Sequence, residues 1–467
     1  MRLLLVRPPR RDTRDVGFAV PPLGLAYVAS AAQLHGHDVE ILDAFVRGWS
    51  WRRFEKEVAQ YRPDCVGITV MTPMLDVVRR AVQVVRPFTN HIIIGGPHPS
   101  ALKEKVFQTL PLVDAAVSGE GETTIIPLLA WLASDQTTDP PTGVLVPERR
   151  YRPSSVTEDL TTLPRPAWDL LDLGQYRYLF ATHPRVATMV TSRGCPFRCS
   201  FCDPGVGGRK WRARPASHVV DEMVWLQQHH NIGFINFYDD NFTLRRSRVE
   251  AICHEILRRK LSIEWKCEGR ADSVDLPMLQ LMRRAGCRAV AYGVESGDAQ
   301  TLKFLRKDIT IEQIENAFCA TRKAGIRSIA YVILGSPGET VQTGHNTVAF
   351  CQKIRADYVQ FSTLSPLPGT PLAETAPTPD MSSPLRHGHN PVDSELARPV
   401  LSDLAPEELA RLVRKAWSQF YLRPGPIWRI ARDSVTSGSI TESRRLALAM
   451  GRWMLEDLTK SVPATAP

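Results

Sequence analysis

Short apolar or β-branched runs alternate with helix-length segments along the first 135 residues. The runs that predict strands are Leu3–Val6, Val39–Leu42, Cys65–Val70, His91–Ile94 and Ala115–Ser118. The segments that predict helices are Leu23–Leu34, Trp51–Tyr61, Met74–Val85, Ala101–Thr109 and Thr123–Ala133. Strands joined by crossover helices predict a parallel sheet with both faces covered, whose ligand binds at the carboxyl ends of the strands.

A second stretch, residues 184–375, repeats this alternation in six units. Its predicted strands are Val186–Val190, Phe234–Tyr238, Glu264–Cys267, Ala289–Val294, Ser328–Ile333 and Tyr358–Thr363. Its predicted helices are Ala216–Gln228, Arg246–Lys260, Leu276–Ala285, Ala299–Phe304, Ile311–Ala324 and Val341–Ile354. We therefore expect two α/β domains, residues 1–135 and 184–375, each with its functional loops after the strands.

Residues 136–183, between these domains, are predicted to be a linker. Asp139–Gly143 is rich in turn residues, and Leu163–Leu171 ends in an apolar run that fits against either neighbour.

The C-terminal region, residues 376–467, is predicted to be a loop or lid followed by a small helical cap. Thr375–Ala405 forms the loop, and Asp403–Tyr421, beginning near Pro406, and Ile440–Leu458 form the helices. Both helices are amphipathic and basic, which favours a cap with a solvated face. A membrane-surface or lipid-substrate role stays open as the alternative, so peripheral membrane contact is not excluded.

The composition is that of a soluble globular protein, with 43% hydrophobic and 23% charged residues among 467. The formal charge of +9 comes with arginines spread along the chain, so we expect a solvated basic surface and no nucleic-acid partner. No apolar run approaches the roughly 20 residues that span a bilayer. Nine cysteines without a secretory signal predict a reducing, cytoplasmic location.

Six of the cysteines are scattered, and we expect them to pack as small apolar side chains: Cys65, Cys253, Cys267, Cys287, Cys319 and Cys351. The other three, Cys195, Cys199 and Cys202, stand in the order Cys-x3-Cys-x2-Cys inside a Gly/Pro turn just after an apolar run. A structural zinc site needs a fourth ligand, and none stands at the usual spacing. Three thiolates on a cubic iron–sulfur cluster leave one iron open for chemistry.

This cysteine motif, with Phe201 before its last cysteine, resembles the signature of the radical S-adenosylmethionine (radical SAM) superfamily. The resemblance implies that Cys195, Cys199 and Cys202 hold a [4Fe-4S] cluster and that the open iron chelates SAM. It also implies that an electron from the cluster cleaves SAM to methionine and a 5′-deoxyadenosyl radical. The implied fold of residues 184–375 is a partial (β/α)6 TIM barrel.

The same resemblance assigns SAM contacts to residues that follow the predicted strands. Asp240 is the expected acceptor for the SAM ammonium, with a helix N-cap by Asp240 or Asn241 as the alternative. Arg270 is expected at the SAM carboxylate, which suits its two-pronged donor geometry. Glu295 and Ser296 are expected at the ribose or amino group, and Gly335 and Gly338 beside the adenosyl moiety, although loop formation explains each of these equally well.

The N-terminal half resembles the Rossmann-like, flavodoxin-like cobalamin-binding domain found upstream of many radical SAM enzymes. The matching pieces are Pro21–Leu25, His37–Asp43, Gly95–Ser100 and Gly119–Glu122. The resemblance places cobalamin near Gly95, Gly96, His98, Gly119 and Glu120, and its lower cobalt face near the loop from Thr69 to Thr72, which includes Met71.

The cobalt-ligating motif Asp-x-His-x-x-Gly of methionine-synthase-type domains is absent from the sequence, so no protein histidine is expected under the cobalt. His98 stands in a turn between two prolines, and we expect it to shape the loop and not to ligate.

Together these resemblances imply a cobalamin-dependent radical SAM enzyme, most often a methyltransferase that moves a methyl group from SAM through methylcobalamin to an unactivated carbon or phosphorus. Oxidative cyclisation or ring rearrangement without methyl transfer is the first alternative, and a non-catalytic sensor or electron carrier is the second. A flavodoxin- or ferredoxin-like donor is the expected electron source. A lipid, a pigment, an antibiotic precursor and a peptide all remain open as the small-molecule substrate.

Overall fold

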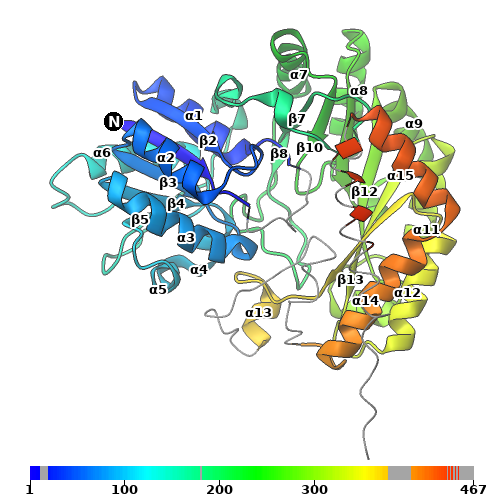
Figure 1. Ribbon diagram of the computed structural model, residues 1–467. Coiled ribbons are helices and arrows are strands. Elements are labelled where there is room, and N and C mark those ends of the chain that lie inside the picture. The colour runs from blue at the N-terminus through cyan, green and yellow to red at the C-terminus, as the bar shows by residue number, and fades with distance from the viewer. Residues whose placement is uncertain are drawn as a thin grey trace, which may run out of the picture.

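The computed structural model describes residues 1–10, 19–178, 181–376 and 401–438, together with residues 440, 441, 443, 444, 447, 448 and 451. It contains two α/β units side by side, with helices α14 and α15 on the far side of the second unit (Figure 1). No helix among the described residues is long and apolar enough to cross a bilayer.

The N-terminal sheet has the strand order β2-β1-β3-β4-β5-β6. Its strands are β1 (Arg2–Arg7), β2 (Asp38–Asp43), β3 (Cys65–Thr69), β4 (His91–Gly95), β5 (Ala115–Val117) and β6 (Val144–Leu145). The first five are parallel, as predicted, and β6 is an antiparallel edge strand that the sequence did not reveal. The order 2-1-3-4-5 places the carboxyl ends of β1 and β3 at the topological switch point, where ligands bind in such sheets.

Helices cover both faces of this sheet because alternate strand residues point to opposite sides. Leu3 and Leu5 pack in the cluster that contains α1 (Leu23–Leu34) and α6 (Gly121–Leu132). Leu4 and Val6 pack against α2 (Trp51–Tyr61) and α3 (Leu75–Val85). The continuous apolar runs of the sequence are therefore strands buried on both faces.

One predicted helix in this domain is wrong in its bounds. Ala101–Thr109 was expected as one helix, but the chain forms α4 (Pro97–Leu102) and α5 (Val106–Thr109) around a short 3₁₀ turn. Lys103 has a φ of +53°, which no continuous right-handed helix accommodates.

The second sheet runs in chain order: β7 (Val186–Met189), β10 (Phe234–Phe237), β11 (Glu264–Gly269), β12 (Cys287–Glu295), β13 (Arg327–Leu334) and β14 (Tyr358–Thr363). Its neighbouring strands are all parallel, and the two outer strands, β7 and β14, are not paired with each other among the described residues. The sheet is thus the partial (β/α)6 barrel that the sequence predicted.

Its helices are α7 (Ala216–His230), α8 (Arg246–Arg258), α9 (Leu276–Arg284), α10 (Ala299–Phe304), α11 (Ile311–Lys323) and α12 (Val341–Lys353). Their bounds agree with the sequence within about two residues. Local signals account for this accuracy: Asp275, Asp298, Thr310 and Thr340 are N-caps whose side chains accept hydrogen bonds from the first turn.

The linker docks onto both domains. The Tyr176 hydroxyl donates to Asp43 in strand β2 (2.9 Å), and the Ala167 backbone N–H donates to the Ala26 carbonyl in α1 (2.9 Å). Trp168 is fully buried in a core cluster that spans both domains, and the Tyr178 ring lies 6.3 Å from the Phe234 ring of β10. The linker therefore fixes the two sheets relative to each other.

Short 3₁₀ turns occur throughout the chain, at Thr72–Met74, Arg86–Phe88, Lys103–Lys105, Leu160–Thr162, Trp168–Leu170, Leu173–Gln175 and Ala271–Ser273.

Helix α14 (Pro406–Tyr421) begins at Pro406, as predicted, and packs on α12 and β14 through Trp417, whose ring lies 5.9 Å from that of Phe361. Helix α15 (Pro424–Thr436), α13 (Pro371–Thr375) and the hairpin of β8 (Ser192–Arg193) and β9 (Arg212–Ala213) were not predicted. The loop or lid expected over Thr375–Ala405 and the helix expected over Ile440–Leu458 lie largely outside the described residues.

Candidate functional site

The loop that carries the three cysteines leaves strand β7 and is anchored by Asp239, a buried carboxylate just after β10. Asp239 accepts hydrogen bonds from the Thr191 backbone N–H (2.6 Å) and the Ser192 hydroxyl (2.7 Å). The Arg248 guanidinium lies 3.4 Å from the same carboxylate and balances its charge. The start of the loop is thereby fixed to the carboxyl end of the neighbouring strand.

The β8–β9 hairpin closes this loop. The Cys195 backbone N–H donates to the Gly208 carbonyl (3.2 Å). Gly194 has a φ of +85°, and a Cβ there would lie 2.3 Å from the Lys210 carbonyl oxygen. Only glycine fits this position, which sets the path of the chain into the first cysteine.

The three thiols lie in one another's electrostatic field. Cys199 is buried, Cys195 is half-buried and Cys202 is exposed. Although Cys202 is open to solvent, desolvation by the surrounding protein, followed by the charges of Cys199 and Cys195, raises its pKa to about 12. Among the described residues, no three His, Cys, Asp or Glu side chains are arranged around a single metal ion. In a cubic cluster each thiolate would bind its own iron, and three thiolates would leave the fourth iron open.

Contacts to later elements hold the middle of the loop. The Ser200 backbone N–H donates to the Leu305 carbonyl after α10, and the Leu372 N–H in α13 donates to the Ser200 carbonyl, both at 2.9 Å. A Cβ on Gly369 would lie 2.7 Å from the Asp203 carboxylate and 3.0 Å from the Ala101 side chain of α4. The cysteine loop therefore reaches the edge of the N-terminal domain.

Asp240, the expected acceptor for the SAM ammonium, lies next to the cysteines. It accepts a hydrogen bond from the Gly194 backbone N–H (2.9 Å). Desolvation raises the pKa of Cys195 and Cys202, and the charge of Asp240 adds to this rise. Desolvation raises the pKa of Asp240 itself, with a further contribution from Asp239. Helix α8 begins at Arg246, so neither Asp240 nor Asn241 is its N-cap. Asp240 is a carboxylate that a cationic ligand would stabilise.

Arg270 is also beside the cysteine loop, but its guanidinium already has partners. It forms a two-pronged ion pair with Asp272 (Nε to Oδ1 2.9 Å, Nη2 to Oδ2 3.0 Å) and donates to the Lys307 carbonyl (2.9 Å). Its Cζ lies 3.7 Å from the centre of the Phe197 ring. A SAM carboxylate at Arg270 stays a prediction, and such a ligand would share the guanidinium with Asp272.

The carboxylate of Glu295 is paired inside the barrel mouth with Lys307 (2.6 Å). The Lys307 ammonium lies 5.8 Å from the centre of the Phe201 ring, which links Glu295 to the cysteine loop. Glu295 has a φ of +62°, a strained conformation typical of functional turns. Ser296 is fully buried, and its hydroxyl lies 3.2 Å from that of Thr347 in α12. Ser296 therefore holds the turn after β12 against helix α12.

The two glycines expected beside the adenosyl moiety lie in a turn covered by the C-terminal region. A Cβ on Gly335 would lie 2.7 Å from the Leu409 side chain of α14. The Gly338 backbone N–H donates to Asp403 (2.6 Å), and a Cβ there would meet nothing within 4 Å. Gly335 thus makes room for α14, whereas Gly338 leaves open space above the turn.

The residues expected at cobalamin gather at the carboxyl edge of β3 and β4. The Val70 N–H, after Thr69, donates to the Gly95 carbonyl (2.8 Å). Gly96 has a φ of +107°, and a Cβ there would lie 3.0 Å from the Val70 carbonyl. Met71 is 46% exposed. An apolar side chain open to solvent beside bare glycine backbone fits the flat face of a corrin, so this edge fits the expected cofactor.

His98 lies below this edge, in helix α4, and is fully buried. Its Nδ1 is 3.0 Å from the Thr72 hydroxyl, and its Nε2 has no hydrogen-bond partner. Burial, followed by the charge of Arg79, lowers the pKa of His98 to about 4, so the ring is neutral at neutral pH. This position agrees with a role in shaping the loop.

Glu120, in the turn after β5, lies in the domain interface. Its carboxylate contacts Arg212 (3.0 Å) and Arg193 (3.2 Å) of the β8–β9 hairpin and accepts a hydrogen bond from the Thr157 N–H (2.7 Å). The preceding Gly119 has a φ of +90°, and its N–H donates to the Ser100 hydroxyl (2.9 Å). In this position Glu120 joins the two domains through its ion pairs with Arg193 and Arg212. A contact between Glu120 and cobalamin stays a prediction.

A polar cluster that sequence reasoning missed lies on the inner face of the barrel. Trp265 and Cys267 of β11 pack in the core under the helices, so Lys266 and Glu268 point inward. Lys266 is 1% exposed and pairs with Glu268, which also accepts a hydrogen bond from the Tyr331 hydroxyl (3.2 Å). The Glu268 carboxylate raises the pKa of Lys266 well above its usual range, although burial alone would lower it.

Neighbouring strands leave room around this cluster. Ala289 and Ala291 of β12 stand in register with Lys266 and Glu268, so small side chains occupy the adjoining positions. The Asn236 amide of β10 is 1% exposed, and neither its oxygen nor its nitrogen has a hydrogen-bond partner. The amide also interacts with the Tyr238 side chain, where it opposes the rise in pKa that burial causes. Buried amides are normally satisfied, so Asn236 has capacity for a ligand or water.

The signal for this cluster was present in the sequence. The segment Glu264–Gly269 alternates polar and apolar residues, whereas the other barrel strands are mostly apolar. Such alternation in a strand covered by helices on its outer face indicates a polar lumen. The arginines of the domain interface carried no comparable signal, because their partners lie about 70 to 90 residues away in the chain.

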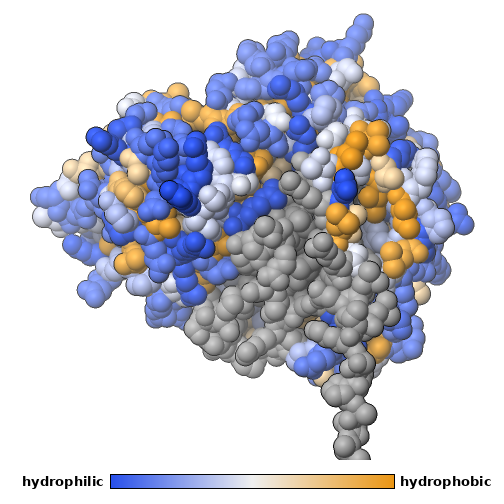
Figure 2. All heavy atoms as spheres, viewed as in Figure 1, coloured by the Kyte–Doolittle hydropathy of each residue, from blue (hydrophilic) through white to orange (hydrophobic). Residues whose placement is uncertain are grey.

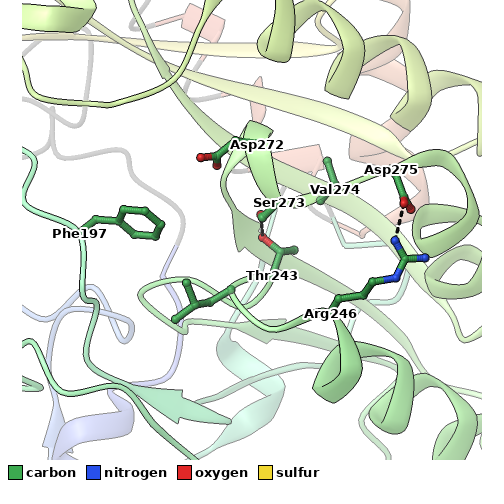
Figure 3. A pocket seen from close by; sticks show the side chains of 8 residues that line it. Phe197, Thr243, Arg246, Asp272, Ser273, Val274 and Asp275 are labelled. Carbon is green, nitrogen blue, oxygen red and sulfur yellow. Dashed lines mark hydrogen bonds and ion pairs between the residues drawn. The ribbon is translucent and has the colours of Figure 1, made fainter.

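An open depression of about 490 Å³ lies at the rim of the barrel, between Phe197 of the cysteine loop and the starts of α8 and α9 (Figure 3). Asp272, the partner of Arg270, lines it together with the hydrogen-bonded hydroxyls of Thr243 and Ser273 (2.6 Å). A ligand in this depression would therefore meet the carboxylate that holds Arg270.

Comparison with known proteins supports this two-domain assignment. The B12 binding domain model matches residues 12–129, and the Radical SAM superfamily model matches residues 189–351. An uncharacterized methyltransferase of Pyrococcus horikoshii is 31% identical over 434 residues, which cover 91% of this chain and 93% of that protein. An anaerobic magnesium-protoporphyrin IX monomethyl ester cyclase of Rubrivivax gelatinosus is 28% identical over 381 residues, covering 79% of this chain and 68% of that protein.

Two solved structures share the fold. TsrM, a radical S-adenosylmethionine methyltransferase from Kitasatospora setae with cobalamin and a [4Fe-4S] cluster bound, superposes with a TM-score of 0.71 at 20% identity, over 96% of this chain and 99% of that one. The cobalamin-dependent S-adenosylmethionine radical enzyme OxsB, with aqua-cobalamin and S-adenosylmethionine bound, superposes with a TM-score of 0.72 at 18% identity. The match covers 98% of this chain and 80% of that one. These likenesses confirm the fold class predicted from the sequence.

Proposed function

Because the chain belongs to the family of radical SAM proteins that carry an N-terminal B12-binding domain, we propose that it is a methyltransferase using a [4Fe-4S] cluster, SAM and cobalamin. The reaction moves a methyl group from SAM, by way of cobalamin, to an unactivated carbon or phosphorus atom of a small molecule. The methyltransferase relatives support this choice over other reactions of the family.

The cofactors supply the chemistry: the cluster delivers the electron that cleaves SAM, and cobalamin carries the methyl group. The chain supplies the positions. Cys195, Cys199 and Cys202 would hold the cluster, Asp240 would accept the SAM ammonium, and the bare edge at Gly96 would support the corrin. The negative charge of Asp240 beside the cysteines and the open backbone at Gly96 support these assignments.

One observation carries the proposal: the cysteine loop and the cobalamin edge lie next to each other. The two segments meet at Gly369. A Cβ added there would come within 3.0 Å of Asp203, directly after Cys202, and of Ala101, in the helix that follows Gly96. The Thr188 hydroxyl on the inner face of β7 donates to the Pro21 carbonyl of the N-terminal domain (3.3 Å). A substrate between the domains would therefore lie next to both proposed cofactor sites.

The inner face of the barrel is the proposed place for the substrate. Glu268 and Tyr331, on strands that helices cover from outside, and Tyr238, directly after β10, are partly open to solvent. Solvent therefore reaches them from the carboxyl end of the barrel. These side chains and the Asn236 amide would orient a substrate that carries hydrogen-bonding groups, while the aromatic rings would exclude water from the reacting atoms.

The test begins with anaerobic reconstitution with iron, sulfide and hydroxocobalamin, followed by metal analysis. We expect about four iron atoms and one cobalt per chain. Incubation with SAM and a low-potential reductant should then yield 5′-deoxyadenosine, together with S-adenosylhomocysteine as the mark of methyl transfer. Cobalt-free protein with a full iron complement would overturn the methyl-transfer mechanism, and zinc in place of iron would overturn the assignment as a whole.

A cyclase that keeps both cofactors but moves no methyl group is the second candidate, favoured by the similarity to the magnesium-protoporphyrin cyclases. It predicts 5′-deoxyadenosine without S-adenosylhomocysteine. A non-catalytic sensor or electron carrier predicts neither product. The proposed electron donor is a small flavodoxin- or ferredoxin-like protein, and replacement of the chemical reductant by such a protein tests it.

A further inference from the structure

Helix α15 exposes large apolar side chains on its outward face. Ile427, Trp428 and Val435 are 53%, 64% and 65% exposed, and Leu422, just before the helix, is 63% exposed. Figure 2 shows hydrophobic residues gathered on the surface over this part of the molecule. Helices of soluble proteins usually bury such a stripe, so this surface requires a physical explanation.

The inward face of α15 is polar instead. Asp433 is fully buried, accepts a hydrogen bond from the Tyr358 hydroxyl, and forms an ion pair with Arg327 (2.7 Å) at the start of β13. Ser434 and Ser437 are buried on the same side. A second ion pair joins Arg429 to Asp357, just before β14 (3.2 Å). These bonds fix the rotation of the helix about its axis and keep Trp428 outward.

The charges around the apolar face are of one sign. Asp433 is the only acidic residue from 422 to 438, and it is buried, whereas Arg423, Arg429 and Arg432 lie in the same segment. The guanidinium of Arg432 lies 5.1 Å from the centre of the Trp428 ring. Further along the chain Ile440 and Leu448 are also exposed, and the sequence between them carries Arg444, Arg445 and one acidic residue, Glu442. An apolar face with tryptophan and arginine at its border is typical of helices that lie in the headgroup region of a bilayer.

We propose that α15 docks this protein onto an anionic lipid bilayer, with Ile427, Trp428 and Val435 in the interface and Arg423 and Arg432 at lipid phosphates. A second copy of the chain is a poorer occupant, because two such faces would bring their arginines together. This inference does not depend on the proposed reaction. It assigns a peripheral, membrane-bound location to this protein.

The test is flotation of the full-length protein, reconstituted with its cofactors, with vesicles of phosphatidylcholine alone or mixed with phosphatidylglycerol. We expect binding to the anionic vesicles that weakens as salt is added. The double variant Trp428→Ser/Val435→Ser should bind about tenfold less, and Arg432→Gln should lose binding to anionic vesicles in particular. All three side chains are exposed, and in Arg432→Gln the buried Asp433 keeps its ion pair with Arg327, so the variants should fold, which circular dichroism would check.

Leu34→Ser is the matched control, because Leu34 is 71% exposed at the end of α1, in the other domain. It should bind as the unchanged protein does. Equal flotation of the α15 double variant and the unchanged protein would overturn the proposal. So would a concentration-dependent dimer that the double variant abolishes in the absence of any vesicle binding, because the occupant would then be a second copy.

Discussion

The carboxylate of Glu120 lies 3.0 Å from the guanidinium of Arg212, and this ion pair joins the turn after β5 to the hairpin that closes the cysteine loop. Arg193 approaches the same carboxylate at 3.2 Å and also binds Glu122. All of these side chains are largely withdrawn from water. Because a broken buried pair leaves an uncompensated charge, this network has a large effect on how the two cofactor edges are held together.

Replacing Glu120 by alanine should therefore uncouple the domains. The two arginines would lose their shared partner, at a cost of about 3–5 kcal/mol. We expect a lower thermal unfolding midpoint and a separation of the unfolding transition into two steps, measured by calorimetry. Glu158→Ala is the control, since Glu158 forms an exposed pair with Lys210 (2.5 Å) and should shift the midpoint little. Indistinguishable calorimetric traces for Glu120→Ala and Glu158→Ala would contradict this role.

The cysteine loop offers a prediction that rests on backbone shape. Gly194→Ala places a Cβ about where the Lys210 carbonyl oxygen lies, at a φ of +85°. The loop must shift at its first ligand, so we expect the variant to fold but to take up less than half the iron of the unchanged protein. Gly425→Ala, where a Cβ meets nothing within 4 Å, is the control and should reconstitute fully. Normal iron content in Gly194→Ala would refute this account of the loop.

Cys195→Ala should abolish 5′-deoxyadenosine production, because two thiolates do not replace the three that hold the cluster. The assay is liquid chromatography of the products after anaerobic incubation with SAM and a reductant. Cys319→Ser is a matched control, since Cys319 lies on α11, away from the loop, and is similarly half-buried. Retained SAM cleavage in Cys195→Ala would mean that the cluster lies elsewhere.

The sequence predicted nearly all of the strands and helices that carry these loops, because their apolar runs and caps are local signals. Ser50 and Thr310, for instance, cap helices that begin where the sequence placed them. Helix α15 was missed because it begins with Pro424, Gly425 and Pro426, residues that are typical of a turn or loop.

Site residues were predictable where a motif fixes them in one short segment, as for Cys195, Cys199 and Cys202. The partners of these residues were not predictable from the sequence. The Asp239 carboxylate that anchors the loop lies 48 residues from Thr191. The Lys307 ammonium lies 12 residues from Glu295 but more than 100 residues from Phe201, the ring to which it links that carboxylate. Such pairings depend on the order of strands in the sheet, which no local pattern encodes.

The Lys266 and Glu268 pair inside the barrel permits a double-mutant test. Glu268→Gln leaves the buried Lys266 ammonium without its counter-charge and should cost about 3–5 kcal/mol of unfolding free energy. Adding Lys266→Met removes that charge and should recover at least half of the loss. Denaturant unfolding of the two single variants and the double variant measures the coupling. Additive losses would show that the two side chains are independent, contrary to the contact between them.

Glu339 gives a prediction for pH. Its carboxylate is buried and accepts hydrogen bonds from the Gly335 and Ser336 backbone N–H groups, while its Oε1 has no partner. Burial raises its pKa from 4.5 to about 7. The folded protein therefore holds a proton that the unfolded chain releases, and the stability contributed by this proton is full below pH 4.5 and is lost as the pH rises to 7.

The shift corresponds to roughly 3 kcal/mol over that window. Glu339→Gln mimics the protonated carboxyl, because the amide oxygen can accept the same two N–H groups and the amide nitrogen takes the place of Oε1. Compared with the unchanged protein, this variant should lose less stability between pH 4.5 and pH 7, measured by denaturant unfolding at a series of pH values. Glu312→Gln, on the exposed first turn of α11, controls for the removal of one carboxylate. If Glu339→Gln and Glu312→Gln show the same pH profile, Glu339 does not titrate in this range.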